Sequence, residues 1–257
     1  MAHILFITGT DTNVGKTVLS VLLTRELLRR GVDVRAVKPL CSGGREDAEA
    51  LLEAQGRAGF QPAPARVSSI AGTIGRPLKR GRLEARPTLD QVNPWHFEEP
   101  LTPLVASRRA GKPLHRKEVV AFLRKSAAGC DTLLVEGAGG LLSPLGEDFD
   151  ARDLIVALKA TPLVVAQNRL GAINQSLLVL DALPGSIRRK AQLVLMQPEL
   201  ADVVSGTNVD VLRERLGSAR VHLVPHLLAE HLQDLTAFRL PASLRASLQR
   251  LAKSVCA

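Results

Sequence analysis

Phosphate chemistry is indicated by the loop Gly9-Thr10-Asp11-Thr12-Asn13-Val14-Gly15-Lys16-Thr17, which follows an apolar run at 3–8 and precedes a helical pattern over 16–30. The backbone N–H groups of such a loop, with a helix amino terminus behind them, bind anions. Lys16 adds a positive charge for the β and γ phosphates, and the Thr17 hydroxyl is placed to bind Mg²⁺. Five residues separate Gly9 from Gly15, where the usual pattern has four, but the flanking strand and helix favour nucleotide binding over an ordinary turn.

A second candidate group ends the next expected strand. Lys38 closes the strand expected at 33–38, and the Gly-rich turn that follows contains Ser42. The carboxyl ends of parallel strands meet at one edge of a sheet, so the ammonium group of Lys38 is expected in the same crevice as the phosphate loop. Ser42 could donate to a ligand or cap the turn. The alternative for Lys38 is an exposed lysine with its stem on the surface, but its position favours a function.

Two acidic residues complete a candidate metal site. Glu136 ends an apolar strand and precedes Gly137-Ala138-Gly139-Gly140, a stretch that lets backbone approach a ligand closely. Asp47 opens the next helix, a position that the helix dipole favours by itself. Because Mg²⁺ prefers oxygen ligands, Thr17, Asp47 and Glu136 form a set suited to it, with water and phosphate completing the shell.

A further anion site is possible at Gly171-Ala172-Ile173-Asn174, which follows a strand and starts a helix. Its free N–H groups could bind a carboxylate, although an ordinary helix start explains the pattern equally well.

The elements that must position these residues alternate regularly along the chain. We expect short apolar strands at 3–8, 33–38, 131–136, 162–167, 191–196 and 220–224. Helical patterns occupy 16–30, 46–55, 101–110, 115–128, 151–159, 173–183 and 208–217. Strands that are apolar on both faces and alternate with helices predict an α/β fold, a doubly wound and mostly parallel sheet of the P-loop type.

Two segments depart from this alternation. Residues 57–90 carry scattered Pro and Gly with the basic residues Arg57, Arg66, Arg76, Lys79, Arg80, Arg82 and Arg86, and they are interpreted as a surface excursion. The tail at 229–257 is expected to contain a helix at 241–254, packed on the body or loosely attached. We therefore predict one P-loop domain at 1–228, followed by a helical tail.

Composition limits the class of protein. The 257 residues fit one α/β domain, and a net charge of +9 is spread over helices and loops with no aromatic-rich recognition motif. A solvated basic surface is therefore a better interpretation than a nucleic-acid site. No apolar run reaches membrane length, and Cys41, Cys130 and Cys256 show neither metal spacing nor a pairing framework. We expect a cytoplasmic protein with no nucleic-acid or membrane partner.

Five segments together resemble the dethiobiotin synthetase family. They begin at Thr8, Lys38, Val92, Val135 and Leu170, and they read TGTDTNVGKT, KPLCSG, VNPWHFEEPLTP, VEGAGG and LGAIN. They occur in the family's order over roughly residues 2–228, and the early first glycine of the loop is typical of that family.

The resemblance implies a cytoplasmic homodimer that uses 7,8-diaminononanoate, CO₂ from bicarbonate, ATP and Mg²⁺. One substrate amine captures CO₂ as a carbamate, ATP phosphorylates the carbamate, and the second amine closes the cyclic urea of dethiobiotin. Such a site must neutralise phosphates and carbamate together.

The resemblance also implies roles for individual residues. Lys38, Lys16 and Thr12 would be catalytic, and Ser42 would face the carbamate end of the substrate. Gly171, Ala172, Ile173 and Asn174 would receive the substrate carboxylate from the neighbouring subunit, and the segment from Asn93 would help form that contact. The nucleotide and its metal would be held by Asn13, Val14, Gly15, Lys16, Thr17, Val18, Asp47, Glu136, Gly137, Ala138, Gly139, Gln197, Pro225, His226 and Leu227.

Several features depart from the family pattern. The stretch between Asp47 and Val92 is a couple of dozen residues longer than expected, so Asp47 is identified from its local Asp-Ala-x-x-Leu pattern. Gln197 stands where the family often has an Asn for the adenine base, and a Gln can make the same amide hydrogen bonds with a longer reach. Arg169 stands where a lysine is often found, and the two cations are not interchangeable.

Three other interpretations compete with this one. A partitioning or septum-placing switch ATPase would usually carry a second lysine early in the loop, where this chain has Asp11, Thr12 and Asn13. An amide-forming relative with a glutaminase domain would need a longer chain and a nucleophilic Cys. A relative retained only for binding would not need Lys16, Thr17, Lys38 and Glu136, all of which are present.

Overall fold

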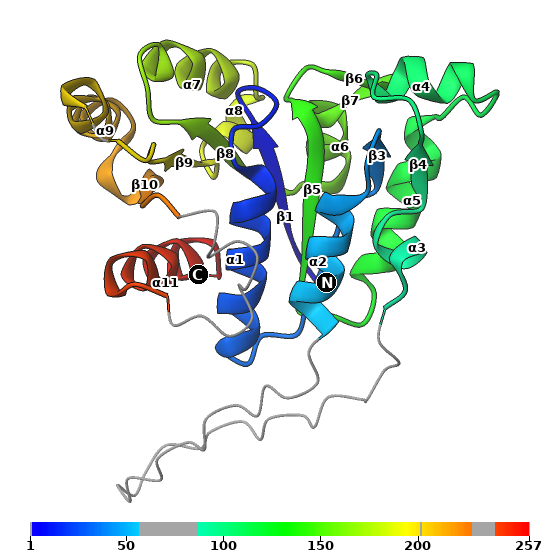
Figure 1. The fold of residues 1–257 in the computed structure, drawn as a ribbon, viewed down its shortest axis with the longest axis horizontal. Coiled ribbons are helices and arrows are strands. Elements are labelled where there is room, and N and C mark those ends of the chain that lie inside the picture. Colours follow the sequence, from blue (N-terminus) through cyan, green and yellow to red (C-terminus); the bar gives the residue numbers. More distant parts are fainter. Residues whose placement is uncertain (1, 57–86, 201, 228–239, 257) are drawn as a thin grey trace, which may run out of the picture.

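The computed structural model describes residues 2–56, 87–200, 202–227 and 240–256. Its centre is a six-stranded sheet in the order β10-β9-β8-β1-β5-β2, with every neighbouring pair parallel (Figure 1). The strands are β1 (His3–Gly9), β2 (Val34–Val37), β5 (Thr132–Gly140), β8 (Thr161–Gln167), β9 (Gln192–Met196) and β10 (Val221–Val224). The predicted α/β, doubly wound fold is confirmed.

The strand order reverses at β1. Strands β5 and β2 follow on one side of it, and β8, β9 and β10 follow on the other. In doubly wound sheets, ligands bind outside the carboxyl ends of the strands at such a point. The loop after β1 is the phosphate loop, so the topology places it where a ligand is expected.

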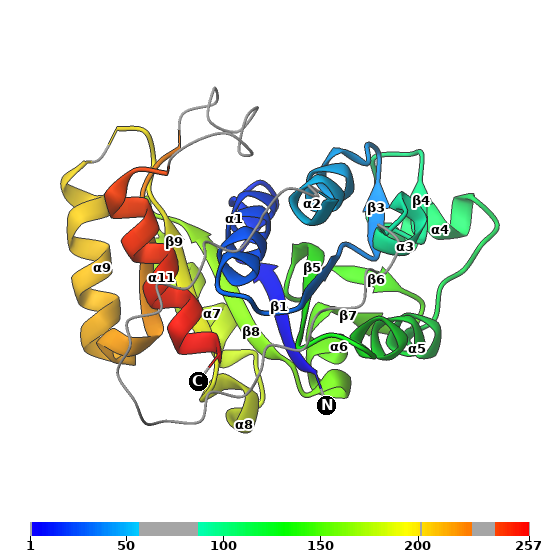
Figure 2. The ribbon, with the colours of Figure 1, turned by 90° about the horizontal axis from the view of Figure 1, so that it is seen from below.

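Helices cover both faces of the sheet, as the two views show (Figures 1 and 2). One apolar core contains residues of α1, α2 and α11, and the other contains residues of α5, α6, α7, α8 and α9. Strand β1 lies between them and is buried on both sides, because Leu5 and Ile7 belong to one core and Phe6 to the other. The helices are α1 (Lys16–Arg29), α2 (Glu46–Gly56), α3 (Leu89–Val92), α4 (Pro103–Arg109), α5 (Arg116–Ala127), α6 (Ala151–Leu158), α7 (Ala172–Asp181), α8 (Gly185–Arg188), α9 (Val203–Leu216) and α11 (Ala242–Cys256).

The six predicted strands and the eight predicted helices are all present among the described residues, and two boundaries differ clearly. Strand β5 continues from the predicted end at Glu136 to Gly140, because Gly140 still pairs with Gly9 of β1. Helix α9 begins at Val203 and not at residue 208, because Asp202 caps it by accepting a hydrogen bond from the Ser205 backbone N–H at 2.7 Å.

Several short elements were not predicted. They are the parallel pair β3 (Leu40–Ser42) and β4 (Trp95–Phe97), the antiparallel pair β6 (Pro144–Gly146) and β7 (Phe149–Asp150), and helices α3 and α8. None exceeds four residues, which is too short for a periodic apolar pattern to be recognised. The β3–β4 pair matters most, since it connects the segment after Lys38 to the segment that contains Asn93.

Helix α11 lies against helix α1 and strand β10. Leu244, Leu248 and Leu251 are fully or almost fully buried in the core on that face, and the Arg30 guanidinium donates to the Gln249 carbonyl at 2.8 Å. The predicted helix at 241–254 is therefore present and packs on the body. The division into a domain at 1–228 and a tail at 229–257 stays a prediction.

The basic excursion predicted at 57–90 falls mostly on residues 57–86, which lie outside the described residues together with all seven of its named cations. Its last residues, from Leu89, belong to helix α3. None of the helices in the described part of the chain has the length and apolarity that a membrane span requires.

Candidate active site

The phosphate loop has a backbone that depends on its glycines. A Cβ atom added to Gly9 would lie 2.7 Å from the Asp11 carbonyl oxygen, so a larger residue cannot fit without moving the loop. Gly15 has φ of +98°, a left-handed conformation that favours glycine. Asn13 also has a positive φ of 57°, which Asn tolerates better than most residues. Glycine is thus required at position 9 because the loop backbone folds back so closely that no side chain fits there.

Both ends of the loop are held by neighbouring strands that the motif alone does not reveal. The Thr10 N–H donates to the Val165 carbonyl of β8 at 2.9 Å, and the Gln167 side chain donates to the Asn13 carbonyl at 3.0 Å. Met196, at the end of β9, packs against Gly15. Gln167 was missed because a polar residue at a strand end carries no distinctive sequence pattern.

The Lys16 side chain is turned toward its own loop. Its Nζ donates to the Asp11 carbonyl at 2.9 Å, and the side chain is almost completely buried. Burial, followed by the nearby ammonium of Lys38, lowers the pKa of Lys16 below its usual value.

Lys38 is held quite differently, by two carboxylates from α2 and β5 (Figure 1). Its Nζ donates to Glu136 Oε1 at 2.7 Å and to Asp47 Oδ2 in a second short hydrogen bond. The Thr17 hydroxyl donates to the same Glu136 oxygen at 2.8 Å. The alternative of an exposed lysine is therefore wrong, since only 6% of Lys38 is exposed.

The electrostatics follow from these contacts. Burial alone would lower the pKa of Lys38, but Glu136 and Asp47 raise it above its usual value, so the ammonium stays charged. Burial would raise the pKa of Asp47, but the Lys38 ammonium outweighs it and lowers that pKa. Lys38 and Asp47 therefore keep their formal charges at neutral pH.

The donor set fits a divalent cation. Glu136 is fully buried, and its Oε2 atom has no hydrogen-bond partner within the described residues. A buried carboxylate oxygen without a partner is costly unless a ligand satisfies it. With the oxygens of Thr17 and Asp47 beside it, this atom supplies the hard ligands that Mg²⁺ prefers.

Lys16, Thr17, Lys38 and Asp47 line one cavity of about 370 Å³. It brings together residues of the phosphate loop, the start of α1, the segment from Lys38 and the turn after Glu136. The predicted site residues in its walls are Thr12, Asn13, Gly15, Lys16, Thr17, Val18, Lys38, Ser42, Asp47, Ala138 and Gly139. Val14 and Glu136 lie beneath this lining, buried, and Gly137 precedes Ala138 on β5.

Cys41 also lines the cavity but is not poised as a nucleophile. Burial raises the pKa of its thiol to about 11. Because the thiolate is the reactive form, a thiol of this kind is inert near neutral pH. This agrees with the argument against a glutaminase-type cysteine.

Asn93 has a position that the sequence did not indicate. Its side chain, only 1% exposed, donates to the backbone carbonyls of Lys38 at 2.8 Å and Pro39 at 3.3 Å. Arg45 in turn donates to the Asn93 side chain at 3.1 Å and to its carbonyl at 2.9 Å. The role of the Asn93-Pro94 segment in a subunit contact stays a prediction, while the Asn93 side chain itself bonds the backbone at Lys38 within the chain.

The remaining predicted residues lie outside this cavity lining. Gly171 caps helix α7 with φ of +89°, and Ala172, Ile173 and Asn174 form its first turn. Their assignment to the carboxylate of a substrate bound by another subunit stays a prediction.

Gln197 begins the segment after β9, and Pro225, His226 and Leu227 follow β10. The Gln197 side chain accepts from Asn168 at 2.9 Å and donates to the Ser205 hydroxyl at 3.2 Å. By valence, one lone pair and one N–H of the amide remain for a ligand.

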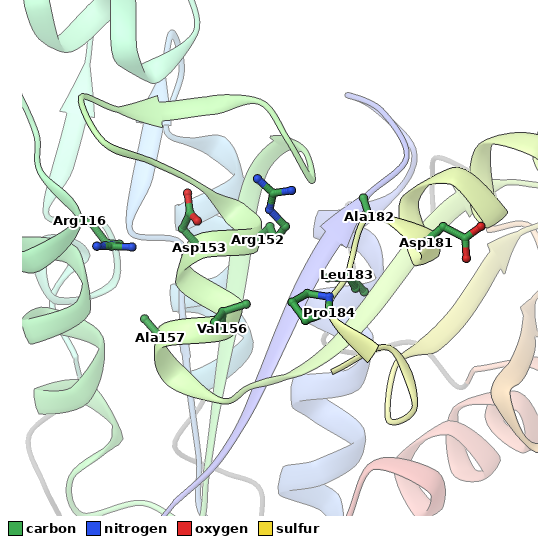
Figure 3. A pocket seen from close by; sticks show the side chains of 9 residues that line it. All are labelled: Arg116, Arg152, Asp153, Val156, Ala157, Asp181, Ala182, Leu183 and Pro184. Atoms are coloured by element: carbon green, nitrogen blue, oxygen red, sulfur yellow. The ribbon is translucent and has the colours of Figure 1, made fainter. Parts of the chain in front are cut away.

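A larger cavity, of about 530 Å³, lies elsewhere (Figure 3). Its walls come from the start of α5, from α6 and from the turn between α7 and α8. None of these residues belongs to the phosphate loop or to the ends of the strands that carry the charged cluster. We therefore assign the chemistry to the smaller cavity. The larger one is lined by Arg116, Arg152, Asp153, Val156, Ala157, Asp181, Ala182, Leu183 and Pro184.

Comparisons with known proteins give the family context. The family described as an AAA domain matches residues 3–229. The ATP-dependent dethiobiotin synthetase of Thermodesulfovibrio yellowstonii is 31% identical over 86% of this chain and 88% of its own length. The dethiobiotin synthetase of Anaeromyxobacter sp. is 37% identical over 70% of each chain, and that of Methanocaldococcus jannaschii is 33% identical over 70% of this chain and 72% of its own.

Solved structures resemble this chain in fold. The cell-division protein MinD of Aquifex aeolicus superposes with a TM-score of 0.53 at 16% identity, covering 99% of this chain and 97% of its own. A plasmid partition protein of Borrelia burgdorferi gives a TM-score of 0.54 at 11% identity, covering 99% and 98%. At these identities the likeness concerns the P-loop fold and carries no information about substrate.

Proposed function

The chain belongs to the family of ATP-dependent dethiobiotin synthetases, and on that basis we propose how its active site carries out the reaction. It is an ATP-dependent ligase that forms dethiobiotin in biotin biosynthesis. The observation that carries the site assignment is the convergence of Lys16, Thr17, Lys38, Asp47 and Glu136 on one cavity at the strand-order reversal.

The substrates we propose are 7,8-diaminononanoate, CO₂ from bicarbonate, and ATP. One amine attacks CO₂ and loses a proton, forming a carbamate. A carbamate oxygen attacks the γ-phosphorus, the bond to the bridging oxygen breaks, and ADP leaves. The second amine then attacks the carbamoyl carbon and loses a proton, and phosphate departs as the cyclic urea closes.

The chain's own groups would neutralise the charge that these steps create. The loop N–H groups from Asn13 to Val18, together with Lys16, bind the phosphates. Lys38 stabilises the carbamate and the phosphoryl group passing to it, with Thr12 and Ser42 facing the carbamate end. Mg²⁺, held by Thr17, Asp47 and Glu136, would supply further positive charge at the phosphate oxygens.

The adenine base of ATP and the carboxylate of the diamine substrate are assigned to separate places. We propose that the adenine base lies beside Gln197 and residues 225–227, where β9 and β10 end. The carboxylate would bind the amino terminus of α7 at Gly171–Asn174 of the other subunit in a cytoplasmic homodimer. The Ala172 N–H donates to the Arg169 carbonyl at 3.0 Å, but no side chain in the described part of the chain caps this helix, and the next N–H groups of its first turn support the assignment.

Phosphate release from ATP and Mg²⁺, with and without the diamine and bicarbonate, tests the reaction. Release that needs both, with dethiobiotin detected by mass spectrometry, is the expected result. Phosphate release at the same rate with and without the diamine would contradict the substrate assignment.

Mixing two inactive variants tests the shared site. Lys38→Ala damages the charged cluster of its own subunit, and Asn174→Pro removes one of the N–H groups at the start of α7. If each active site combines residues of two subunits, each mixed dimer should have one intact site of its two. Because half of random dimers are mixed, the mixture should recover about a quarter of the wild-type activity. No recovery, with mixed dimers demonstrated by mass spectrometry, would contradict a shared site.

A further inference from the structure

We propose that Lys38 is an internal counter-cation of the metal-binding carboxylates, so that its ammonium group and a divalent cation compete for Asp47 and Glu136. This inference rests on the metal site in the proposed function. It assigns to Lys38 a second role, which ends when metal and nucleotide bind together.

The contacts place the Lys38 ammonium on the same two carboxylates that would hold the metal. Lys38 Nζ lies 2.7 Å from Glu136 Oε1 and is hydrogen-bonded to Asp47 as well. A cation on Glu136 Oε2, which has no partner in the described part of the chain, would therefore lie close to the Lys38 ammonium. The Thr17 hydroxyl now donates its proton to Glu136 Oε1, whereas as a metal ligand it would turn a lone pair to the cation. Two cations sharing these carboxylates would repel each other strongly at such short range.

The charge balance points the same way. The formal charges of Lys16, Lys38, Asp47 and Glu136 cancel one another. A divalent cation entering this balanced cluster gains little, because both carboxylates already share the Lys38 ammonium and Lys16 lies nearby. The triphosphate changes the balance, since it brings the negative charge that both a metal and a released lysine require.

The cavity gives the released side chain somewhere to go. Lys38 lines its wall together with the phosphate-loop residues and Ser42. When the metal takes the carboxylates, the ammonium can therefore turn to the phosphate and carbamate oxygens. In this way metal loading would place the cation that the reaction uses.

Binding of Mn²⁺ without nucleotide, followed by the free-ion signal in electron paramagnetic resonance, tests the competition. Wild type should bind weakly, and Lys38→Met should bind about tenfold tighter or more, because a competing cation has been removed. Lys16→Met is the matched control. It removes the same charge from the same cavity, but that ammonium donates to a backbone carbonyl. Equal tightening in both variants, or none in Lys38→Met, would overturn the proposal.

Two further measurements identify the site of binding. Adding Glu136→Gln to Lys38→Met should abolish the gain in Mn²⁺ affinity, and a gain that persists would mean that the metal binds elsewhere. Mn²⁺ should also raise the melting temperature of Lys38→Met more than that of wild type, because it replaces the missing partner of two carboxylates. A variant that stays unfolded even with Mn²⁺ would contradict the idea that metal and ammonium are interchangeable.

The outcome is separable from that of the proposed function. Metal affinity without nucleotide does not depend on turnover, whereas dethiobiotin formation by wild type does. If wild type forms dethiobiotin but Lys38→Met has unchanged Mn²⁺ affinity, only the counter-cation role is contradicted. If wild type is inactive but the variant binds Mn²⁺ more tightly, only the proposed reaction is contradicted.

Discussion

The phosphate loop and the Lys38 cluster both bring a lysine into the same cavity, but they are built in opposite ways. The loop is one continuous segment, and Lys16 contacts a carbonyl of that segment. The cluster joins Lys38, Asp47 and Glu136 from three separate elements. The pKa of Lys16 is lowered and that of Lys38 is raised, so two residues of one type differ because of their neighbours.

This difference teaches what each lysine is suited to do. Within the described part of the chain, Lys16 Nζ donates to a backbone carbonyl and to no carboxylate, so an incoming phosphate competes with no negatively charged partner for this ammonium. Lys38 must first leave two carboxylates. Binding of phosphate can therefore be immediate at the loop, whereas action by Lys38 depends on what else has bound.

The largest expected effect comes from removing the two lysines in turn. Lys38→Ala should lower kcat for ring closure by about 10²–10³-fold, as removal of one preorganised charge-stabilising donor does, while ATP binding persists. Lys16→Ala should instead weaken ATP binding itself. Steady-state kinetics with calorimetric titration of a non-hydrolysable ATP analogue would separate them. Similar losses of ATP affinity in both variants would erase the contrast.

The local character of the loop is tested by Gly9→Ala. Its Cβ would lie 2.7 Å from the Asp11 carbonyl, so the loop must move at a cost of about 1–3 kcal/mol in free energy of unfolding. Nucleotide affinity should fall with it, while Mn²⁺ affinity without nucleotide should not change. The matched control is Gly56→Ala, where nothing lies near the added atom. A normal ATP affinity in Gly9→Ala would show that the loop tolerates the extra atom.

The assembled character of the cluster is tested by Asn93→Ala. It leaves two carbonyls beneath Lys38 without their amide partner, at a cost of about 1–3 kcal/mol in free energy of unfolding. We expect kcat to fall more than KM for ATP rises, because Asn93 positions Lys38 and does not touch the loop. Asn208→Ala is the control, since Asn208 is an equally buried amide that bonds Asn168 and Arg169. Equal kinetic losses in both would mean a general effect of lost stability.

The smallest effect concerns His222, which belongs to neither region. Burial, with Arg250 and Arg213 nearby, lowers its pKa to about 4. The unfolded chain takes up a proton near pH 6.5 and the folded chain only near pH 4, so stability is lost as pH falls through this interval. The loss should reach about 2 kcal/mol between pH 7 and 5.

Urea titrations at several pH values would measure this dependence. His222→Gln should remove the part of the pH dependence of the free energy of unfolding that His222 causes. Variants of the phosphate loop and of the Lys38 cluster can then be compared in mild acid without that contribution. An unchanged curve would show that His222 does not control stability in acid.

Much of the fold was predictable because strands buried on both faces leave a strong apolar signal. The short pairs β3–β4 and β6–β7 were not predictable, because three residues or fewer carry no period. The predicted start of helix α9 is five residues too late, because the apolar pattern alone does not include the turn that the Asp202–Ser205 capping box begins. The excursion at 57–86 lies outside the described residues, so that prediction is untested.

In the candidate site, the sequence predicted the residues that belong to recognisable motifs, but it did not predict the residues that support them. Gln167 and Asn93 support the loop and Lys38 through backbone carbonyls. An amide that bonds a carbonyl elsewhere in the chain has no spacing rule, so only the fold reveals its partner.

The sequence by itself determined the phosphate loop, the order of elements and the family, because each depends on residues close together in the chain. Only the tertiary structure decided that Lys38 lies between Asp47 and Glu136 and that Asn93 supports it from beneath. The physical reason is that these contacts depend on the pairing of β2 with β5 and of β3 with β4, which brings distant segments within a few ångströms. A charged side chain's behaviour is set by such neighbours and not by its own place in the sequence.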